Sequence, residues 1–496
     1  MLVTKKSCNE TQTNKGSLFY RAPFSFSGRF VLSLSFAFYM VNNVDSAEVS
    51  NKLLHNWKKF SQSTQNINHR RWLKALENPE AIKLATAWRN LRGYDAYDII
   101  ARYKLPGQLK PGLHISSSNI NSMPWLKEYL PKEIYDSILS GKGFVKQASI
   151  IPTNTYYQNK GVLAATRNLI NNKKVPYTDS EDTLRNPDGT AMLLNSETAA
   201  AIPYIKPENG LELMWSFVAY GVGTETLALD PVITLSCSQE GNIDYKYKSA
   251  IWWQKYHGRT QIGDERDVDD KEELVEGGAV YAYQPYDVRG FAGIRQRYAN
   301  GKKHDDFKVF LPAMRRTRTL SGADAQDPMW AGLEVTWDDW RSYWVKTNRS
   351  QFEYKLVGEK LILASPEVGY IYNSGKFNND KCKWDELELE LRPVWILEII
   401  DKSGSYQYKK RTLYIDMETY YSQYERTTDQ RDNIFRIWDD SRAWRPFDGD
   451  SQWRHITIYN AINHRVNYFF MTPQWDNRSE NVTDEQFDID QLRDYQ

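Results

Sequence analysis

The pattern of apolar positions has two periods along this chain. From about residue 48 to 105, apolar residues recur every three or four positions, as Trp57, Leu73, Leu76 and Trp88 do. That spacing places them on one face of a helix and leaves the charged residues on the other. We therefore predict an N-terminal helical region over 48–105.

A second helical stretch follows between residues 126 and 141. Its apolar residues repeat every four positions from Leu126 to Ile138, and Gly141 stands where a helix would end. Pro131 lies inside the stretch, and a proline within a helix removes a backbone hydrogen bond. The sequence thus predicts two short helices that meet at Pro131.

Beyond residue 210 the apolar period becomes two. In 245–253, Tyr245 and Tyr247 share one face while Lys246 lies on the other, and in 386–391 leucines alternate with glutamates. Such alternation is typical of strands that bury one face. Further pairs of apolar runs are separated by polar turns, which predicts hairpins. These pairs are 294–298 with 306–311, 394–400 with 406–415, and 419–425 with 433–438.

Successive hairpins predict an antiparallel meander, and such sheets tend to curl. We predict an α+β fold in which residues from about 210 to 472 form one curved antiparallel sheet. The helical residues 48–140 should pack on this sheet or at its rim. Residues 473–496 are interpreted as a polar C-terminal tail because charged and amide side chains dominate them.

The net charge and the aromatic content of the chain indicate which kinds of partner to expect. The formal net charge is +1 over 496 residues, so no overall field would draw the protein to nucleic acid. Aromatic residues make up 14% of the chain and include 17 Trp. They suit the half-buried surface of a sheet, and they also suit the wall of an apolar cavity with a few polar groups.

The first 47 residues have the pattern of an export signal. Five basic residues precede an apolar run over 30–41, which is too short to span a bilayer comfortably. Ser46 and Ala47 lie where a small residue would allow cleavage. We predict a signal peptide over 1–47 and an exported, soluble product. An N-terminal anchor that is not cleaved is the alternative.

Export would determine which cysteines remain in the mature protein and whether they can form a disulfide. Cleavage would remove Cys8 and leave Cys237 and Cys382 in an oxidising compartment. They would form either one disulfide or two separate buried thiols. The sequence leaves both open, because it does not show whether the two residues approach each other.

Two charged clusters are candidates for chemistry. Arg315, Arg316 and Arg318 follow a predicted strand end, where they would either clamp an anionic headgroup or bind acids on neighbouring strands. Asp338 and Asp339 lie between two tryptophans. Glycosidase carboxyls face each other across a bond, whereas adjacent side chains diverge, so we interpret this pair as a helix start.

The chain contains no HExxH, paired CxxC, G-x-S-x-G, P-loop or dinucleotide-binding motif. We therefore predict no metal, no cofactor and no catalytic residues. Dispersed catalytic residues would leave no such trace, so an enzyme stays among the alternatives.

Two blocks of sequence resemble one known family. In 307–360, a strand that ends at Leu311 and Pro312 is followed by the arginines, an aromatic and acidic segment, and a second strand over 354–358. In 394–438, a strand is followed by an aspartate and a threonine, then by a second strand, a turn and a third strand. With a weaker match from residue 106, this order over 106–440 resembles an uncharacterised family of secreted Gram-negative proteins, numbered 1329 among the domains of unknown function.

The resemblance implies a fold and a compartment. The family's fold is grouped with the LolA and LolB carriers, which move lipoproteins across the periplasm. For this chain it implies a curved antiparallel sheet or an incomplete β-barrel within residues 106–472, and a location in the periplasm of a Gram-negative bacterium. It implies no reaction.

A carrier-like fold favours a cavity lined by aromatic side chains on the concave face of the sheet. A packed core is the alternative for the same residues. The candidates are Trp215, Phe217, Trp253, Trp330, Trp337, Trp340 and Trp344.

Three functions follow as hypotheses. The first is a periplasmic binding or carrier protein for lipid-like molecules. Its partners would be a hydrophobic or acyl-chain ligand and an envelope transporter or outer-membrane component, and not nucleic acid. The second is a non-catalytic interaction subunit of an envelope transport complex, and the third is a glycan-active envelope enzyme.

Overall fold

The structure is a computed structural model that describes residues 46–220, 225–260, 267–268, 271–475 and 482–495. Residues 1–45 of the predicted signal peptide lie outside the described residues. None of the helices in the described ranges combines the length and the apolar character needed to cross a membrane.

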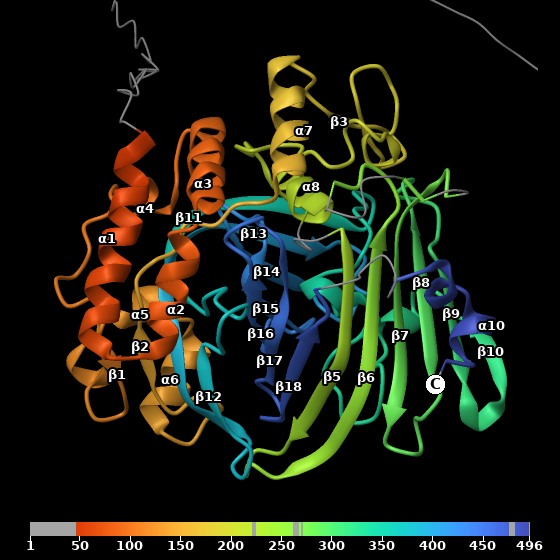
Figure 1. Ribbon diagram of the computed structural model, residues 1–496. Coiled ribbons are helices and arrows are strands. Elements are labelled where there is room, and N and C mark those ends of the chain that lie inside the picture. The colour runs from red at the N-terminus through yellow and green to blue at the C-terminus, as the bar shows by residue number, and fades with distance from the viewer. Residues whose placement is uncertain (1–45, 221–224, 261–266, 269–270, 476–481, 496) are drawn as a thin grey trace, which may run out of the picture. The chain divides into compact units, whose positions relative to one another are not determined.

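The N-terminal helices bury the tryptophans that gave them their pattern. Trp57, Trp72 and Trp88 are fully buried. Asn66 and Asn78 cap the second and third helices, because each side chain accepts a hydrogen bond from a backbone amide of the first turn. The predicted N-terminal helices are confirmed (Figure 1). They are α1 Ser46–Thr64, α2 Ile67–Leu76, α3 Pro79–Arg92 and α4 Ala96–Ile100.

Short helices and strands alternate in the next part of the chain. Pro131 separates two helices as predicted, and Gly141 ends the second in the left-handed conformation, with φ of 65°. The elements are β1 His114–Ile115, η1 Ile120–Ser122, α5 Leu126–Tyr129, α6 Lys132–Ser140, β2 Ala148–Ile150 and α7 Lys160–Asn171. They are followed by β3 Tyr177–Thr178, β4 Leu184–Arg185 and η2 Met192–Leu194.

The predicted start of the sheet at residue 210 is wrong, because Gly210–Tyr220 forms helix α8. Its apolar residues lie on almost every side, so they show no helical period in the sequence. Gly210 allows the helix to approach strand β11 (Phe352–Ala364): a Cβ at this position would lie 2.4 Å from the carbonyl carbon of Tyr354.

Sixteen strands of the described residues form one sheet. Its first half in the sequence comprises β5 Thr226–Cys237, β6 Ile243–Lys255, β7 Leu274–Gln284, β8 Ala292–Tyr298, β9 Asp306–Leu311 and β10 Arg316–Thr319, with η3 Pro312–Met314 between the last two. After β11 come β12 Gly375–Asn378, β13 Lys383–Asp401, β14 Lys410–Asp416, β15 Ser422–Thr428, β16 Ile434–Trp444, β17 Ser451–Asn460 and β18 Val466–Pro473.

The order of the strands joins the end of the chain to its middle. The sheet runs β1-β2-β13-β14-β15-β16-β17-β18-β5-β6-β7-β8-β9-β10, with β11 and β12 paired to β13 off this path. The β2–β13 pairing is parallel and the other pairings in the path are antiparallel. The segments 245–253 and 386–391 lie in β6 and β13, so both strand predictions are confirmed.

The sheet curls, and the N-terminal helices lie beside one part of it. In Figure 1, α1–α4 lie near β11 and β13, on the opposite side of the sheet from β8–β10. The prediction of an α+β fold with a large curved, unclosed sheet and N-terminal helices is confirmed in these terms.

Residues 482–495, part of the predicted polar tail, pack on the convex face. Phe487 and Leu492 are buried in a cluster with Trp252, and the ring of Tyr495 lies 5.1 Å from that of Trp252. The elements here are η6 Asp484–Phe487 and α10 Ile489–Leu492. A few spaced apolar residues are enough for this contact, although the average composition of the segment is polar.

Candidate ligand site on the concave face of the sheet

A stretch of the chain between β10 and β11 lies inside the curl of the sheet. We call residues 329–347 the inner segment. It contains the short 3-10 helix η5, Trp337–Ser342. The Asp339 carboxylate accepts hydrogen bonds from Thr336 N at 2.9 Å and from Thr336 Oγ1 at 2.8 Å, which caps this helix. The helix start predicted at the Asp pair is therefore confirmed.

The two aspartates of the inner segment bind different strands. Asp338 accepts a hydrogen bond from Arg295 of β8 at 3.0 Å, and Asp339 accepts one from Arg411 of β14 at 2.6 Å. All four side chains are buried. Burial raises the pKa of Asp338, and the charge of Arg295 opposes that rise. Because each carboxylate is held by its own arginine, the pair does not have the opposed geometry of glycosidase acids.

Two further charged residues fix the inner segment. Glu334 accepts hydrogen bonds from Arg436 Nε at 3.0 Å and from Asn460 Nδ2 at 2.7 Å. Arg341 donates to Glu276 of β7 at 2.7 Å, and burial lowers the pKa of this arginine to about 10. The inner segment is thus tied by buried ion pairs to strands β7, β8, β14 and β16.

An apolar cavity of about 80 Å³ remains between the inner segment and the sheet. Apolar side chains of β5, β6, β7, β16, β17 and β18 form one wall, and the inner segment forms the other. Trp253, Trp330 and Trp340 belong to its lining, together with Met329. Such a chamber, apolar with few polar groups, is typical of sites for hydrophobic ligands.

Several residues of the cavity wall carry polar groups. Asp339 and Arg341 are already engaged in the ion pairs described above. Trp330 Nε1 and Thr234 Oγ1 are buried and have no hydrogen-bond partner in the protein. A buried donor without a partner is costly. These two groups would therefore gain from a polar atom on a ligand or from a bound water.

A ladder of aromatic rings leads from the surface to the cavity. Tyr245, whose side chain is 41% exposed, stacks on Tyr247 with ring centroids 6.3 Å apart. Tyr247 in turn stacks on Trp330 at 5.2 Å. Tyr247 Oη also donates to the carbonyl of Ala331 at 2.7 Å. The exposed outer ring of the ladder is thus connected to residues 330 and 331 of the inner segment.

The five predicted cavity tryptophans that lie on β6 and the inner segment divide into two groups. Trp253, Trp330 and Trp340 line the cavity. Trp337 and Trp344 are buried beside it: Trp337 packs on Phe307 and Phe291, and Trp344 packs on Trp253 with centroids 4.1 Å apart. These last two rings support the wall and do not form it.

Trp215 and Phe217 do not line the cavity, which corrects their assignment to its wall. Both belong to helix α8, because the segment that we predicted to begin the sheet is helical. Phe217 is buried in the main core. Trp215 is buried in a separate cluster, and its Nε1 donates to Thr178 Oγ1 at 2.8 Å.

The three arginines predicted to hold a headgroup do not line the cavity. Arg315 lies just before β10, Arg316 and Arg318 lie within it, and all three are exposed. Arg318 forms an ion pair with Asp324 at 2.8 Å. The short strand β10 is one end of the sheet, so these exposed side chains lie at its edge.

Cys237 and Cys382 are joined in a disulfide. The bond connects the end of β5 with the residue before β13, and 145 positions separate the two cysteines in the sequence. Its stabilising effect should be large, because it closes a long loop.

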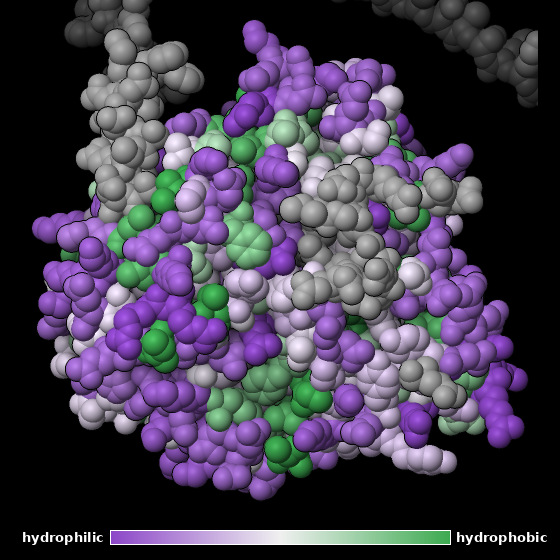
Figure 2. All heavy atoms as spheres, in the orientation of Figure 1, coloured by the Kyte–Doolittle hydropathy of each residue, from purple (hydrophilic) through white to green (hydrophobic). Residues whose placement is uncertain are grey.

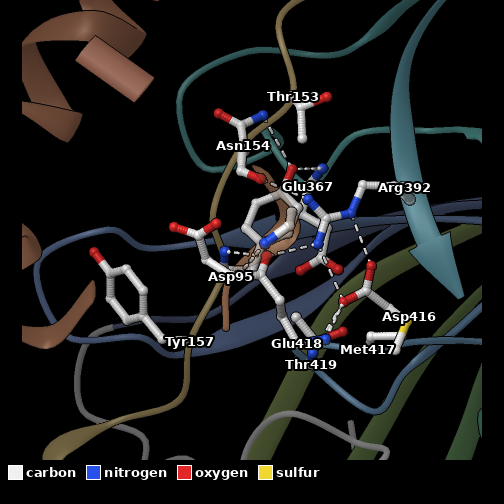
Figure 3. Close-up of polar contacts among 12 residues, drawn as sticks. Asp95, Thr153, Asn154, Tyr157, Glu367, Arg392, Asp416, Met417, Glu418 and Thr419 are labelled. Carbon is white, nitrogen blue, oxygen red and sulfur yellow. Dashed lines mark hydrogen bonds and ion pairs between the residues drawn. The ribbon is translucent and has the colours of Figure 1, made fainter. Parts of the chain in front are cut away.

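A second buried network ties the N-terminal region to the sheet (Figure 3). Arg392 of β13 binds Asp416 at 2.8 Å and Glu418 at 2.8 Å, and it donates to the carbonyl of Asn154 at 2.5 Å. Arg92 at the end of α3 donates to the carbonyl of Glu418 at 2.7 Å. Because Arg92, Arg392, Asp416 and Glu418 are entirely buried, this network holds elements together and offers no access to a substrate.

The network contains acids whose pKa is raised by burial. Burial raises the pKa of Glu390 and of Asp95 to about 7, and that of Glu367 to about 8. Glu390 accepts hydrogen bonds from Asn154 and Tyr156. Sequence reasoning missed these residues, since Glu390 stands in an alternating strand where the glutamates were expected to face water. These partners lie in the segment between β2 and α7, 236 and 234 positions away in the sequence, so no local pattern indicates them.

Among the described residues, no group of three or more His, Cys, Asp or Glu is arranged to hold a metal ion.

A hollow of about 370 Å³ lies on the convex face, lined in part by Phe377, Trp384 and Phe470. Figure 2 shows apolar side chains gathered at the lower edge of the visible face, near the ends of β12 and β18.

Residues 146–493 match the family described as "Protein of unknown function (DUF1329)". The chain belongs to this family. The family predicted from residues 106–440 is thereby confirmed, although the match begins later and ends later than the resemblance. The DUF1329 match covers β2–β18, α10 and the inner segment, and it follows α1–α6. No curated protein matches the sequence.

Three solved structures are similar to this DUF1329 chain. A domain from Vibrio parahaemolyticus, provisionally assigned as an outer membrane lipoprotein-sorting protein, has 14% identity and a TM-score of 0.40, covering 57% of this chain and 98% of its own. A DUF1329 protein from Desulfovibrio piger has 14% identity and a TM-score of 0.38, with 54% and 92% covered. A LolA-superfamily protein from Nitrosomonas europaea has 11% identity and a TM-score of 0.36, with 57% and 99% covered.

Proposed function

We propose that this protein binds a hydrophobic molecule, such as one with an acyl chain, beneath the inner segment. It would do so as a binding or carrier protein and not as an enzyme, in the periplasm to which the predicted signal peptide would send it. The observation that carries the proposal is the apolar cavity between the inner segment and the sheet, with Trp253, Trp330 and Trp340 in its wall.

The small volume of the cavity implies that part of the protein must move to admit a longer ligand. Its volume is about 80 Å³, whereas sites for ligands of moderate size enclose roughly 300–1,000 Å³. The cavity therefore accommodates the end of a chain, and a longer ligand needs part of the inner segment to shift. Each methylene that enters contributes about 0.8 kcal/mol, which gives a long chain enough driving force to displace weakly held residues.

The inner segment is held unevenly, which indicates the part that moves. Residues 334–341 carry the four buried charged anchors, and breaking a buried ion pair costs about 3–5 kcal/mol. Residues 329–333 are held by neutral hydrogen bonds, such as Ser236 Oγ to the Gly332 carbonyl at 2.6 Å and Tyr247 Oη to the Ala331 carbonyl. Neutral bonds cost only about 1 kcal/mol each. The site should therefore open at 329–333, where the aromatic ladder reaches it.

Quenching of tryptophan emission by a brominated fatty acid tests the proposal. Ser249 is buried in the cavity wall, so Ser249→Leu would fill the space without removing a tryptophan. Ser117 is exposed, and Ser117→Leu is the matched control. We expect saturable quenching in the wild type and in Ser117→Leu, and a loss of at least tenfold in affinity in Ser249→Leu.

Two other results would contradict ligand binding in the cavity. If the wild type shows no saturable quenching and releases no lipid on solvent extraction, the concave face is a closed core. The protein would then be better explained as an interaction subunit of an envelope complex. If Ser249→Leu binds as tightly as the wild type, the ligand lies outside the cavity.

A further inference from the structure

Two turns of the sheet lie side by side at one end of the strands β6–β10. Since β7, β8, β9 and β10 pair as an antiparallel series, the β7–β8 turn and the β9–β10 turn fall at the same end. The first residues of β6 reach this end too, because Lys248 pairs with Gln284. The turns are in contact: a Cβ on Gly290 would lie 3.6 Å from Cγ of Pro312.

The tips of these two turns expose large apolar side chains. Tyr286 is 92% exposed and Met314 is 55% exposed. Tyr286 also borders a groove of about 640 Å³, to which Tyr281, Tyr283 and Pro285 contribute. A single exposed apolar residue is ordinary on a soluble protein. Two at the tips of adjoining turns, one of them almost fully exposed, form a projecting apolar surface.

Basic residues surround these tips. Lys246 and Arg289 line the same groove as Tyr286. Arg315 and Arg316 follow Met314 directly, and both are exposed. In Figure 2, strongly hydrophilic side chains cover the β9–β10 hairpin at the lower right. One exposed acid, Asp287, lies on the β7–β8 turn, so the basic side chains outnumber it.

We propose that this end of the sheet docks on the surface of an anionic membrane. Tyrosine and methionine at projecting tips can enter the interface between headgroups and acyl chains, where an amphipathic ring is stable. Lysine and arginine place their stems along the apolar surface and their charges among anionic headgroups. The arrangement of apolar tips within a basic ring fits a lipid surface, which presents anionic groups above apolar chains.

The docking surface lies near the aromatic ladder on β6. Lys246, which lines the groove, lies between Tyr245 and Tyr247 of the aromatic ladder, on the opposite face of β6. A membrane bound at the turns would therefore lie close to residues 329–333. The docking proposal does not depend on the ligand proposal, because it concerns side chains on the outer surface and its test involves no cavity ligand.

Co-sedimentation with large unilamellar vesicles tests the docking surface. We expect the wild type to bind vesicles of phosphatidylethanolamine and phosphatidylglycerol, to bind phosphatidylcholine vesicles weakly, and to be released by high salt. Arg315→Asn combined with Arg316→Gln should reduce binding roughly tenfold or more, at about 1 kcal/mol for each charge removed. Asn is chosen at 315 because φ there is 50°, a conformation that Asn tolerates. Tyr286→Ser should also reduce binding severalfold.

Matched variants elsewhere complete the test. Tyr177 is 45% exposed on β3, and Lys58 and Lys59 are exposed on α1. Tyr177→Ser and the double change Lys58→Gln with Lys59→Gln should leave vesicle binding unchanged. Equal loss in these controls, or full binding by the Arg315 and Arg316 variant, would overturn the proposal. A wild type that binds no vesicle would overturn it as well and would direct attention to an acidic protein partner for the same surface.

Discussion

Asp338 and Asp339 are adjacent in the sequence, yet they bind arginines on β8 and β14, strands that lie far apart in the sheet order. Strands β15, β16, β17, β18, β5, β6 and β7 lie between them. Two neighbouring side chains reach both strands because the sheet curls around the inner segment. These two ion pairs can form together only because the sheet is curled, and they also fix the inner segment in place.

Loss of one of these carboxylates should destabilise the whole fold. Asp339→Asn leaves the buried Arg411 guanidinium with less compensating charge, so we expect a loss of about 3 kcal/mol in the free energy of unfolding. Urea denaturation measures this. Asp306→Asn is the matched control, since its ion pair with Lys308 is partly exposed and should contribute less than about 1 kcal/mol. Equal effects of the two substitutions would contradict the anchoring role.

Hydrogen exchange should show where the inner segment opens. Amides within 329–333 are held in a part of the segment fixed by neutral hydrogen bonds, whereas Trp344 N donates to the carbonyl of Asp338 at 2.8 Å within the charged part. We expect faster exchange at 329–333 than at 338–344 in native buffer. Uniform protection across 329–347 would contradict local opening and would require the whole segment to move.

Reduction of the disulfide should destabilise the protein without changing its fold. The bond closes a loop of 145 positions, and the chain-entropy relation gives a contribution of about 5 kcal/mol, of which engineered and natural bonds often deliver about 2–4 kcal/mol. We expect a lower midpoint of thermal unfolding in reductant for the wild type. Cys237→Ser with Cys382→Ser should show the lower midpoint in both conditions. An unchanged midpoint in reductant would contradict a stabilising bond.

The strands with one buried face could be predicted from the sequence, and the buried charges could not. β6 was predictable because its polar and apolar residues alternate. In β13 the same alternation misled us about Glu388 and Glu390. His69 of α2 binds Glu388 at 2.8 Å, across 319 positions of sequence, and Glu390 binds Asn154. A local pattern does not contain information about a second layer that covers the polar face of a strand.

The positions of the aromatic residues, too, could be predicted only in part from the sequence. Their abundance indicated an apolar interior, and three of the seven candidates line the cavity. Trp215 and Phe217 were misplaced because α8 is apolar on almost every side and shows no helical period. The ion pairs of the inner segment were not predictable, since Asp338 and Asp339 meet arginines that only the curl of the sheet brings near.

Stability should fall as pH rises because of Glu367. Burial raises the pKa of this carboxyl from 4.5 to about 8, so the folded state keeps a proton that the unfolded state loses above its own pKa. This stabilisation is complete below about pH 4.5 and is lost as pH rises to about 8. Glu367→Gln, which keeps a neutral side chain for the Gln423 contact, should stabilise the protein by on the order of 3 kcal/mol at pH 8.

The same variant should have little effect at pH 4.5, where the carboxyl is protonated in the folded state. Thermal unfolding of wild type and Glu367→Gln from pH 4.5 to 8 measures the difference. A constant difference across this range, of either sign, would show that ionisation of Glu367 is not its cause.

Crystals grown with a brominated fatty acid would show directly where a hydrophobic ligand binds. We expect an anomalous bromine peak in the cavity near Trp253, Trp330 and Trp340, with residues 329–333 displaced and the ion pairs of 334–341 intact. Bromine found only outside the curl of the sheet, with the cavity empty and residues 329–333 in place, would contradict ligand binding beneath the inner segment.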